Sequence, residues 1–301
     1  MQSISVLIPT YNSESTLQQC VKSLHCSAEQ AKIKIEIYIF DNRSDDNTLA
    51  HAKELYNSDL ISGCQCNGRN IGIATFYKMA NWYIKSCSAK DSWSPVFLMD
   101  SEDTVPVDYF SFLCFAAQSA AHEGCSLVIP QYALRSLTYS SMHNRIGTNS
   151  FFFNAKYLPL KTRWLACLLS PGAVGYSSMV WGCLYLNSQP FDRFRSHTKK
   201  FVMDPGLLPA AWENTLCANL LLEFDYMLSS GVLYRGCTNS KFLEFPGADS
   251  ALASFIYIND GSLSILETAR KHDLVPEDIR SSLSDIINHK VNFSNLVQSF
   301  K

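Results

Sequence analysis

The chain has 301 residues, enough to bury the core of one large domain or of two smaller ones. Hydrophobic residues make up 47% of the sequence and charged residues 17%, which excludes a disordered chain and a coiled coil. The formal net charge is −2 and no cluster of Lys and Arg occurs, so we expect no nucleic acid partner.

The N-terminal segment begins with a strand pattern followed by a helix pattern. Apolar residues 4–8 predict a short strand that ends near Pro9. Apolar residues within 17–24 recur at i, i+3, i+4 and i+7, the spacing of one helix face, and Ser13 stands where a helix cap is expected. The chain therefore starts with a strand, a polar loop and a helix.

The same unit recurs along the first hundred residues. Isoleucines alternate with polar residues over 33–39, which predicts a strand that ends at Asp41, and a helix pattern follows over 49–55. A further helix is expected over 74–84, before an apolar strand at 96–99. Successive units of strand and helix predict an α/β fold with a mostly parallel sheet flanked by helices.

The rest of the chain is less regular. Alternation weakens after the apolar run 127–130, and an amphipathic helix pattern begins at Pro276. Residues 164–191 carry no charge and are long enough to cross a bilayer as a helix, but Pro171 and Gly175 interrupt them. We expect a buried strand and helix there, with contact at a membrane surface or a true membrane span as the alternatives.

The cysteines and the N-terminal sequence indicate the cellular location of the protein. Eleven cysteines are scattered without CxxC spacing, as in a cytosolic protein with reduced thiols. The segment MQSISVLIPTYN has no basic region followed by an apolar one, and so does not resemble a signal peptide. We predict a cytoplasmic protein, with peripheral contact at the inner face of the membrane as an option.

Candidate chemistry gathers where the predicted strands end. In a parallel sheet, ligands bind outside the carboxyl ends of the strands. The residues at those ends are polar or acidic. They are Pro9-Thr10-Tyr11-Asn12, Asp41-Asn42-Arg43-Ser44-Asp45-Asp46 and Asp100-Ser101-Glu102-Asp103.

These loops, together with Asn70-Ile71-Gly72, resemble the family 2 glycosyltransferases of GT-A fold in order and spacing. The resemblance covers the first third of the chain. It implies a Rossmann-like sheet and a nucleotide-sugar donor. It also implies three parts, which are a nucleotide-sugar-binding half at 1–105, an acceptor-binding half at 106–260 and a C-terminal helical extension at 261–301.

The resemblance also implies a nucleotide-binding set. The first loop opens a helix, whose free N–H groups can face a ligand, and the Asp41 carboxylate can accept an N–H of the base. Asp45 and Asp46 could instead cap the next helix. The implied nucleotide-binding residues are Pro9, Thr10, Tyr11, Asn12, Asp41, Asn70 and Asp100.

The acidic loop is the candidate metal site. A hard divalent cation held by carboxylates can neutralise the diphosphate leaving group. The family pattern is Asp-x-Asp-Asp, whose second Asp is the principal ligand, and here Glu102 stands at that position. The expected ligands of Mn²⁺ or Mg²⁺ are Asp100 and Glu102, and the alternative is a solvated acidic turn.

A looser match in the second half suggests the base. Trp212-Glu213-Asn214 resembles the acidic pair near the family's catalytic base, but the second acid is Asn214 here. Glu213 is therefore the expected base, with Asp204 or Asp225 as alternatives. His143 and His197 are expected to be ordinary polar histidines, with a further metal or phosphate contact as the alternative.

The sequence thus predicts a hexosyltransferase-like enzyme of polysaccharide biosynthesis, metal-assisted and inverting, that moves a sugar from a nucleoside diphosphate sugar to a hydroxyl of a glycan or lipid-linked acceptor. The competing hypothesis is a non-catalytic binding or scaffold protein with a degenerate metal site. A nucleotidyltransferase would need a glycine-rich phosphate loop after the first strand, and Pro9-Thr10-Tyr11-Asn12 contains no glycine. Oligomeric state carries no prediction.

Overall fold

The computed structural model describes residues 3–72, 74–90, 93–136, 145–147, 182–203, 220 and 223–237. The chain divides into two compact units, and every helix and strand given below belongs to the first, which comprises residues 1–148, 177–206 and 224–238. The helix expected after Pro276 and the boundary at residue 261 lie outside the described residues.

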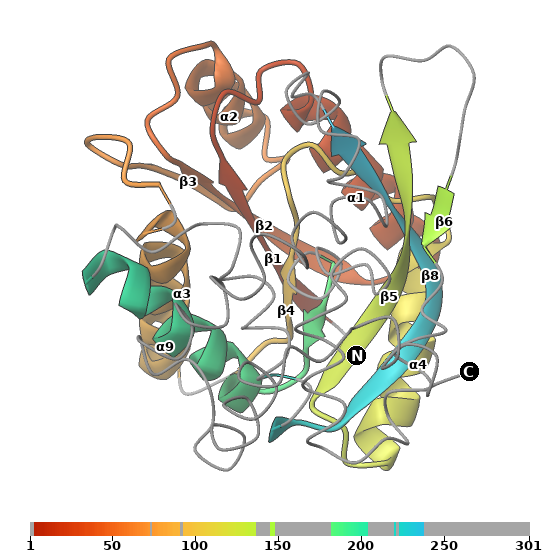
Figure 1. Ribbon diagram of the computed structural model, residues 1–301. Coiled ribbons are helices and arrows are strands. Elements are labelled where there is room, and N and C mark those ends of the chain that lie inside the picture. The colour runs from red at the N-terminus through yellow and green to blue at the C-terminus, as the bar shows by residue number, and fades with distance from the viewer. Residues whose placement is uncertain are drawn as a thin grey trace, which may run out of the picture. The chain divides into compact units, whose positions relative to one another are not determined.

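The N-terminal half alternates strands and helices as the sequence predicts (Figure 1). Its elements are β1 (Ser3–Thr10), α1 (Leu17–Ala31), β2 (Lys34–Asp41), α2 (Thr48–Asn57), β3 (Gly63–Cys66), α3 (Ala74–Lys90) and β4 (Val96–Leu98). The elements that follow are α4 (Tyr109–His122), β5 (Leu127–Ser136), β6 (Arg145–Gly147), β7 (Leu184–Tyr185), α9 (Ser188–Met203) and β8 (Tyr226–Cys237).

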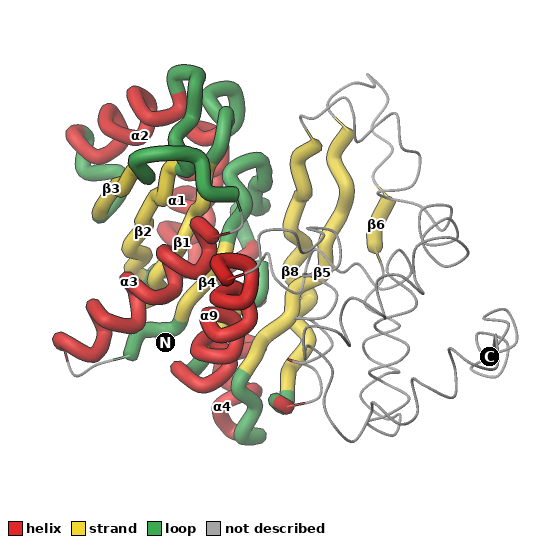
Figure 2. Tube along the Cα trace, turned by 60° about the vertical axis from the view of Figure 1, so that its left-hand side comes forward, coloured by secondary structure: helices red, strands yellow, loops and turns green. Residues whose placement is uncertain are grey.

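The strands form one eight-stranded sheet in the order β3-β2-β1-β4-β7-β5-β6, with β8 paired to β5. Strand β1 runs parallel to β2 and β4, β2 runs parallel to β3, and β5 runs parallel to β8. Antiparallel pairs join β7 to β4 and β5, and β6 to β5. Figure 2 shows the β1, β2, β3 and β4 strands beside the long β5 and β8 pair. The predicted α/β fold with a mostly parallel sheet is confirmed.

One face of the sheet is covered by α1 and α4. Ile4, Val6 and Ile8 of β1 are fully buried in the same core cluster as apolar residues of both helices, because alternate residues of a strand share a face. The buried Ser27 of α1 hydrogen-bonds to the start of α4. The Ser27 hydroxyl accepts the Phe110 N–H at 2.9 Å, which fixes the start of α4 against α1.

The opposite face is covered by α3, beside which α9 lies (Figure 1). The rings of Tyr38 and Phe40 on β2 lie 5.0 and 5.3 Å from that of Trp82 on α3. The Tyr83 ring lies 5.7 Å from that of Phe191 on α9. Aromatic side chains of alternate strand residues thus pack against α3, which in turn packs against α9.

Strand β3 was not predicted from the sequence. Its four residues, Gly-Cys-Gln-Cys, have neither the β-branched residues nor the alternation of a typical strand. Pairing with β2 from Tyr38↔Gly63 to Asp41↔Cys66 produces the strand, which lies at the edge of the sheet.

Within the part of the chain that the structure describes, no helix has the length and apolar character needed to cross a membrane. Most of the uncharged stretch 164–191 lies outside that part, and α9 begins only at Ser188.

Candidate active site

Three predicted loops meet at one edge of the sheet because the strands before them are parallel. The Asn42 N–H donates to the Thr10 carbonyl at 2.8 Å, and the Asn67 N–H donates to the Asp41 carbonyl at 2.8 Å. On the other side of β1, the Met99 N–H donates to the Leu7 carbonyl at 3.1 Å. These bonds place the carboxyl ends of β1, β2, β3 and β4 side by side (Figure 1), as the sequence predicts.

Asp41 lies at the centre of this edge and is only 1% exposed. Its Oδ1 accepts the hydroxyls of Thr10 at 3.2 Å and Ser44 at 2.5 Å. Its Oδ2 accepts the Ser44 N–H at 3.1 Å and the Cys66 thiol at 3.3 Å. One buried carboxylate therefore joins the ends of β1, β2 and β3.

The first loop has a left-handed backbone conformation at Asn12 and is hydrogen-bonded to the second loop. Asn12 has a φ of 52°, and its side-chain oxygen accepts the Asp45 N–H at 2.9 Å. The Asn12 N–H donates to the Ser44 hydroxyl at 3.0 Å. Pro9 lies in β1 opposite Phe40 of β2, whereas Tyr11 is 45% exposed. The Tyr11 ring is thus available to a planar ligand at the end of β1.

Asp46 braces the start of α2, which is the alternative role that its sequence position suggests. Its Oδ1 accepts the Thr48 N–H at 2.9 Å, and its Oδ2 accepts the Glu14 N–H from the first loop at 3.2 Å. Burial acts to raise the pKa of Asp46, but the hydrogen bonds from the Thr48 side chain and backbone and from Glu14 outweigh it and lower the pKa. Asp46 therefore stabilises the first and second loops, and these hydrogen bonds explain the position of its carboxylate.

Ser13 links the first loop to the acidic loop. It was expected to cap α1, but the residue before the helix is Thr16 and the cap has no side-chain hydrogen bond. The Ser13 carbonyl accepts the N–H groups of Thr16 and Leu17 instead. Its hydroxyl lies 2.7 Å from that of Ser101, in the middle of the acidic loop. The first and third predicted loops are thereby in direct contact.

The carboxylates of the acidic loop differ in exposure. Asp103 is fully buried, whereas Asp100 and Glu102 are partly exposed. Burial, together with the charges of Asp103 and Asp100, raises the pKa of the neighbouring Cys20 thiol. The Glu102 N–H donates to Asp100 Oδ1 at 3.3 Å. The two predicted metal ligands are thus the carboxylates of the loop that solvent can reach.

Asn42 hydrogen-bonds to a fourth segment, residues 67–72. It was not predicted to be a site residue. Its side-chain oxygen accepts the Ile71 N–H at 2.9 Å and the Asn67 side chain at 3.1 Å. Its amide group donates to the Asn70 side chain at 2.8 Å. Gly72, which ends the segment, has a φ of 53° that favours glycine. The only sequence signal for this role is the place of Asn42 directly after Asp41.

Of the remaining sequence candidates, Asp225 and His197 are described by the structure and are not part of this group. Asp225 precedes β8, which runs parallel to β5, so Asp225 lies at the amino edge of the sheet, away from the loops. His197 is buried in α9. The expected base Glu213, Asp204 and His143 lie outside the described residues. Among the described residues, no group of three or more His, Cys, Asp or Glu is placed to hold a metal ion.

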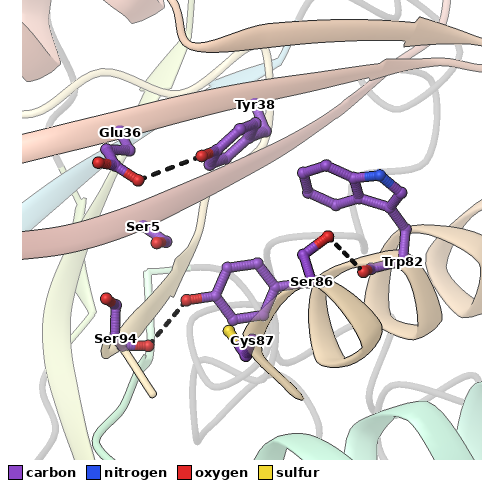
Figure 3. Close-up of a pocket in the computed structure, with 8 residues that line it drawn as sticks. Ser5, Glu36, Tyr38, Trp82, Ser86, Cys87 and Ser94 are labelled. Atoms are coloured by element: carbon purple, nitrogen blue, oxygen red, sulfur yellow. Dashed lines mark hydrogen bonds between the residues drawn. The ribbon is translucent and has the colours of Figure 1, made fainter. Parts of the chain in front are cut away.

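A small, partly open hollow lies elsewhere, between β1, β2 and helix α3 (Figure 3). Tyr38, Trp82 and Tyr83 line it, and the Tyr38 hydroxyl donates to Glu36 at 3.1 Å. Burial and the Glu36 charge raise the pKa of Tyr38 to about 12. The Tyr83 hydroxyl donates to the Ser94 carbonyl at 2.9 Å. None of the predicted site residues lines this hollow.

Comparison with known proteins finds a family match in the N-terminal part of the chain. Residues 5–75 match the family model described as Glycosyl transferase family 2. This range includes β1, β2 and β3 and the loops after them. Among curated proteins, a search finds no matching sequence.

Solved structures are similar in fold to a larger part of the chain than the family model matches. Residues 1–349 of S. aureus TarS in complex with UDP-GlcNAc superpose with a TM-score of 0.50 at 14% identity, over 92% of this chain and 68% of that chain. The structure of S. aureus TarS itself gives a TM-score of 0.50 at 15% identity, over 97% of this chain and 53% of that chain. The family resemblance predicted from the sequence is confirmed by the family match, and the GT-A type of fold by the likeness to TarS. Residues 5–75 are therefore similar in sequence to the family 2 glycosyltransferases, enzymes that transfer a sugar from a nucleotide sugar, and the chain is similar in fold to TarS.

Proposed function

We propose that the chain transfers a hexosyl group from a UDP-sugar to a hydroxyl of a glycan or lipid-linked acceptor, in polysaccharide biosynthesis. The observation that carries the proposal is the convergence of three polar loops on one edge of the sheet. Hydrogen bonds between Thr10 and Asp41, and between Ser13 and Ser101, join these loops. The likeness to TarS, whose structure was solved with UDP-GlcNAc, supports a uridine nucleotide.

The nucleotide is proposed to lie across the ends of β1, β2 and β3. Asp41 would accept an N–H of the base, and the exposed Tyr11 ring would stack on the base or ribose. The loop that contacts the nucleotide would be formed by Pro9, Thr10 and Asn12. Asn70, which is hydrogen-bonded to Asn42, would contact the opposite side of the nucleotide. Asp100 would face the diphosphate.

A divalent cation fits the acidic loop as Mg²⁺ or Mn²⁺ bound by few protein ligands. Such ions are commonly held by one or two carboxylates, with water and substrate phosphates completing the shell. Asp100 and Glu102 offer two partly exposed carboxylates at a strand end, which suits this mode. When bound, the ion would supply positive charge to neutralise the leaving diphosphate.

Direct displacement with inversion is the proposed stereochemical course. It needs one base on the face opposite the leaving group, and Glu213 is proposed for that role. A cytoplasmic location is proposed as well, because eight of the nine cysteines among the described residues are free thiols.

The proposal is tested by incubating the protein with UDP-, GDP- and dTDP-sugars and Mn²⁺ and measuring the release of nucleoside diphosphate. We expect metal-dependent release from a UDP-sugar, and UDP binding in calorimetry. Chelation with EDTA, followed by addition of Mn²⁺, serves as the control for metal dependence. If no donor binds at all, the proposed function is wrong.

The replacement of the family's second Asp by Glu102 favours one second candidate, a non-catalytic binding protein. Such a protein would bind UDP in calorimetry and release none from any sugar donor, with or without Mn²⁺.

A further inference from the structure

The acceptor positions of the Asp41 carboxylate are already filled by the protein itself. Oδ1 accepts two hydroxyls, and Oδ2 accepts the Ser44 N–H and the Cys66 thiol. An ionised carboxylate has roughly four lone-pair positions for hydrogen-bond donors. A base N–H can therefore reach Asp41 only if one of these donors leaves.

Cys66 is the donor best placed to leave. Thr10 is 3% exposed within β1, and one of the two Ser44 donors is a backbone N–H, whereas Cys66 is exposed at the end of the edge strand β3. A thiol is the weakest donor of the set, and its sulfur lies 3.3 Å from Asp41 Oδ2. The same sulfur lies 3.3 Å from the Asn67 carbonyl, which can accept the thiol after it turns.

The protonation state of Cys66 agrees with this role. Burial, the hydrogen bond to Asp41 and the Asp41 charge raise the pKa of the Cys66 thiol, against the smaller opposing effect of Arg43. The sulfur therefore keeps its proton at neutral pH and donates to the carboxylate. A thiolate at this position would repel Asp41.

We propose that Cys66 occupies, in the protein without ligand, the place of the base N–H at Asp41, and that the nucleotide binds by displacing it. This exchange rests on the proposed function. Cys66 then lowers the affinity for the nucleotide, whereas base selectivity rests on Asp41, whose carboxylate pairs with a base that presents a ring N–H. Uracil has such a group, whereas the corresponding ring nitrogen of cytosine is an acceptor.

The first test compares the affinity of UDP for the wild-type protein and for Cys66→Ala, by calorimetry. The variant has no thiol to displace, so we expect UDP to bind about two- to fivefold more tightly, the effect of one weak hydrogen bond. CDP affinity should stay much lower than UDP affinity in both proteins. Weaker UDP binding by Cys66→Ala would overturn the exchange.

The second test labels thiols with methyl methanethiosulfonate, with peptide mass spectrometry as the readout. UDP should slow labelling of Cys66 and leave labelling of Cys26, an exposed thiol on α1, unchanged. Labelled wild-type protein should lose UDP affinity by at least about tenfold, since the added group covers Asp41, and labelled Cys66→Ala should not.

The outcomes separate the two proposals. If the wild-type protein binds no UDP, the proposed function fails and the exchange fails with it. If UDP binds but does not protect Cys66 from labelling, and if labelling does not weaken UDP binding, the exchange is overturned and the proposed function stands.

Discussion

Two regions along the same strands, β1 and β2, have opposite character. At their carboxyl ends, polar side chains from distant loops hydrogen-bond to one another, as Thr10 and Ser44 do with Asp41. Toward their amino ends, the side of the sheet that faces α3 carries aromatic rings, and Tyr38 lies 5.0 Å from Trp82. The first region keeps side chains such as Tyr11 exposed, whereas the second lines a hollow.

The difference shows why the presence of a hollow does not identify the site. The hollow is made where α3 packs on the sheet, and its hydroxyl groups hydrogen-bond locally, as Tyr83 does with Ser94. At the carboxyl edge, the buried Asp41 carboxylate hydrogen-bonds to the loops, and the buried Asp103 lies in the same loop as the partly exposed Asp100 and Glu102. We therefore expect changes at the carboxyl edge to alter nucleotide binding or turnover, and changes at the hollow to alter stability.

The largest effect is expected from Glu102→Gln. The substitution keeps the length of the side chain and removes its charge, so a bound cation would lose one anionic ligand. We expect the turnover of a UDP-sugar to fall by about 100-fold, because charge stabilisation of a few kcal/mol is lost. UDP release at several Mn²⁺ concentrations measures this.

Glu102→Asp is the matched control, because it restores the residue of the family pattern and should remain active. Unchanged turnover in Glu102→Gln would remove Glu102 from the metal site and favour the reading of the loop as a solvated acidic turn.

Trp82→Ala should have the next largest effect, and on stability only. The variant loses the ring contacts with Tyr38 and Phe40 on β2. Because Trp82 is only partly buried, we expect the free energy of unfolding to fall by about 2 to 3 kcal/mol, at or below the low end for large aromatic truncations. Urea unfolding measures the loss. UDP affinity measured below the transition should be unchanged, and a drop of tenfold or more would show that the hollow belongs to the nucleotide site.

The sequence predicts features that depend on neighbouring residues, and it misses features that depend on residues far apart along the chain. The ends of the first two strands were predicted near Pro9 and at Asp41 from local patterns, because the apolar runs stop there, and β1 ends one residue later, at Thr10. Strand β3 was missed, since Gly63–Cys66 is a strand only through its pairing with β2. Within the site, the role of Asn42 was missed, because its side chain bonds to residues 25 to 30 positions away. Such partners follow from topology and not from any local pattern.

Asn42→Ala tests this missed residue. The variant loses the side chain that accepts the Ile71 N–H and bonds to Asn67 and Asn70. We expect UDP affinity to fall about tenfold, because the segment before α3 is no longer held beside Asp41 and must be ordered on binding.

The control is Asn42→Asp, which keeps the acceptor oxygen for the Ile71 N–H but not the amide donor, and should retain part of the affinity. Equal UDP affinity in the wild-type protein and Asn42→Ala would mean that this segment does not contribute to the site.

The smallest effect is expected from Asp46→Ala, and pH identifies its cause. The wild-type carboxylate braces Thr48 and Glu14, so we expect the variant to lose about 1 kcal/mol of unfolding free energy at pH 7, as for a helix cap. The pKa of Asp46 is lowered in the folded protein, so its contribution is complete above the ordinary pKa of Asp, about 4, and is lost as the pH falls through the lower folded value. Unfolding curves of the two proteins should therefore converge in acid, whereas Asp46→Asn, which keeps an acceptor oxygen and no charge, should differ from Asp46→Ala by an amount that does not change with pH. A difference between wild type and Asp46→Ala that persists unchanged at pH 2 to 3 would mean that the ionised carboxylate is not what holds the two loops together.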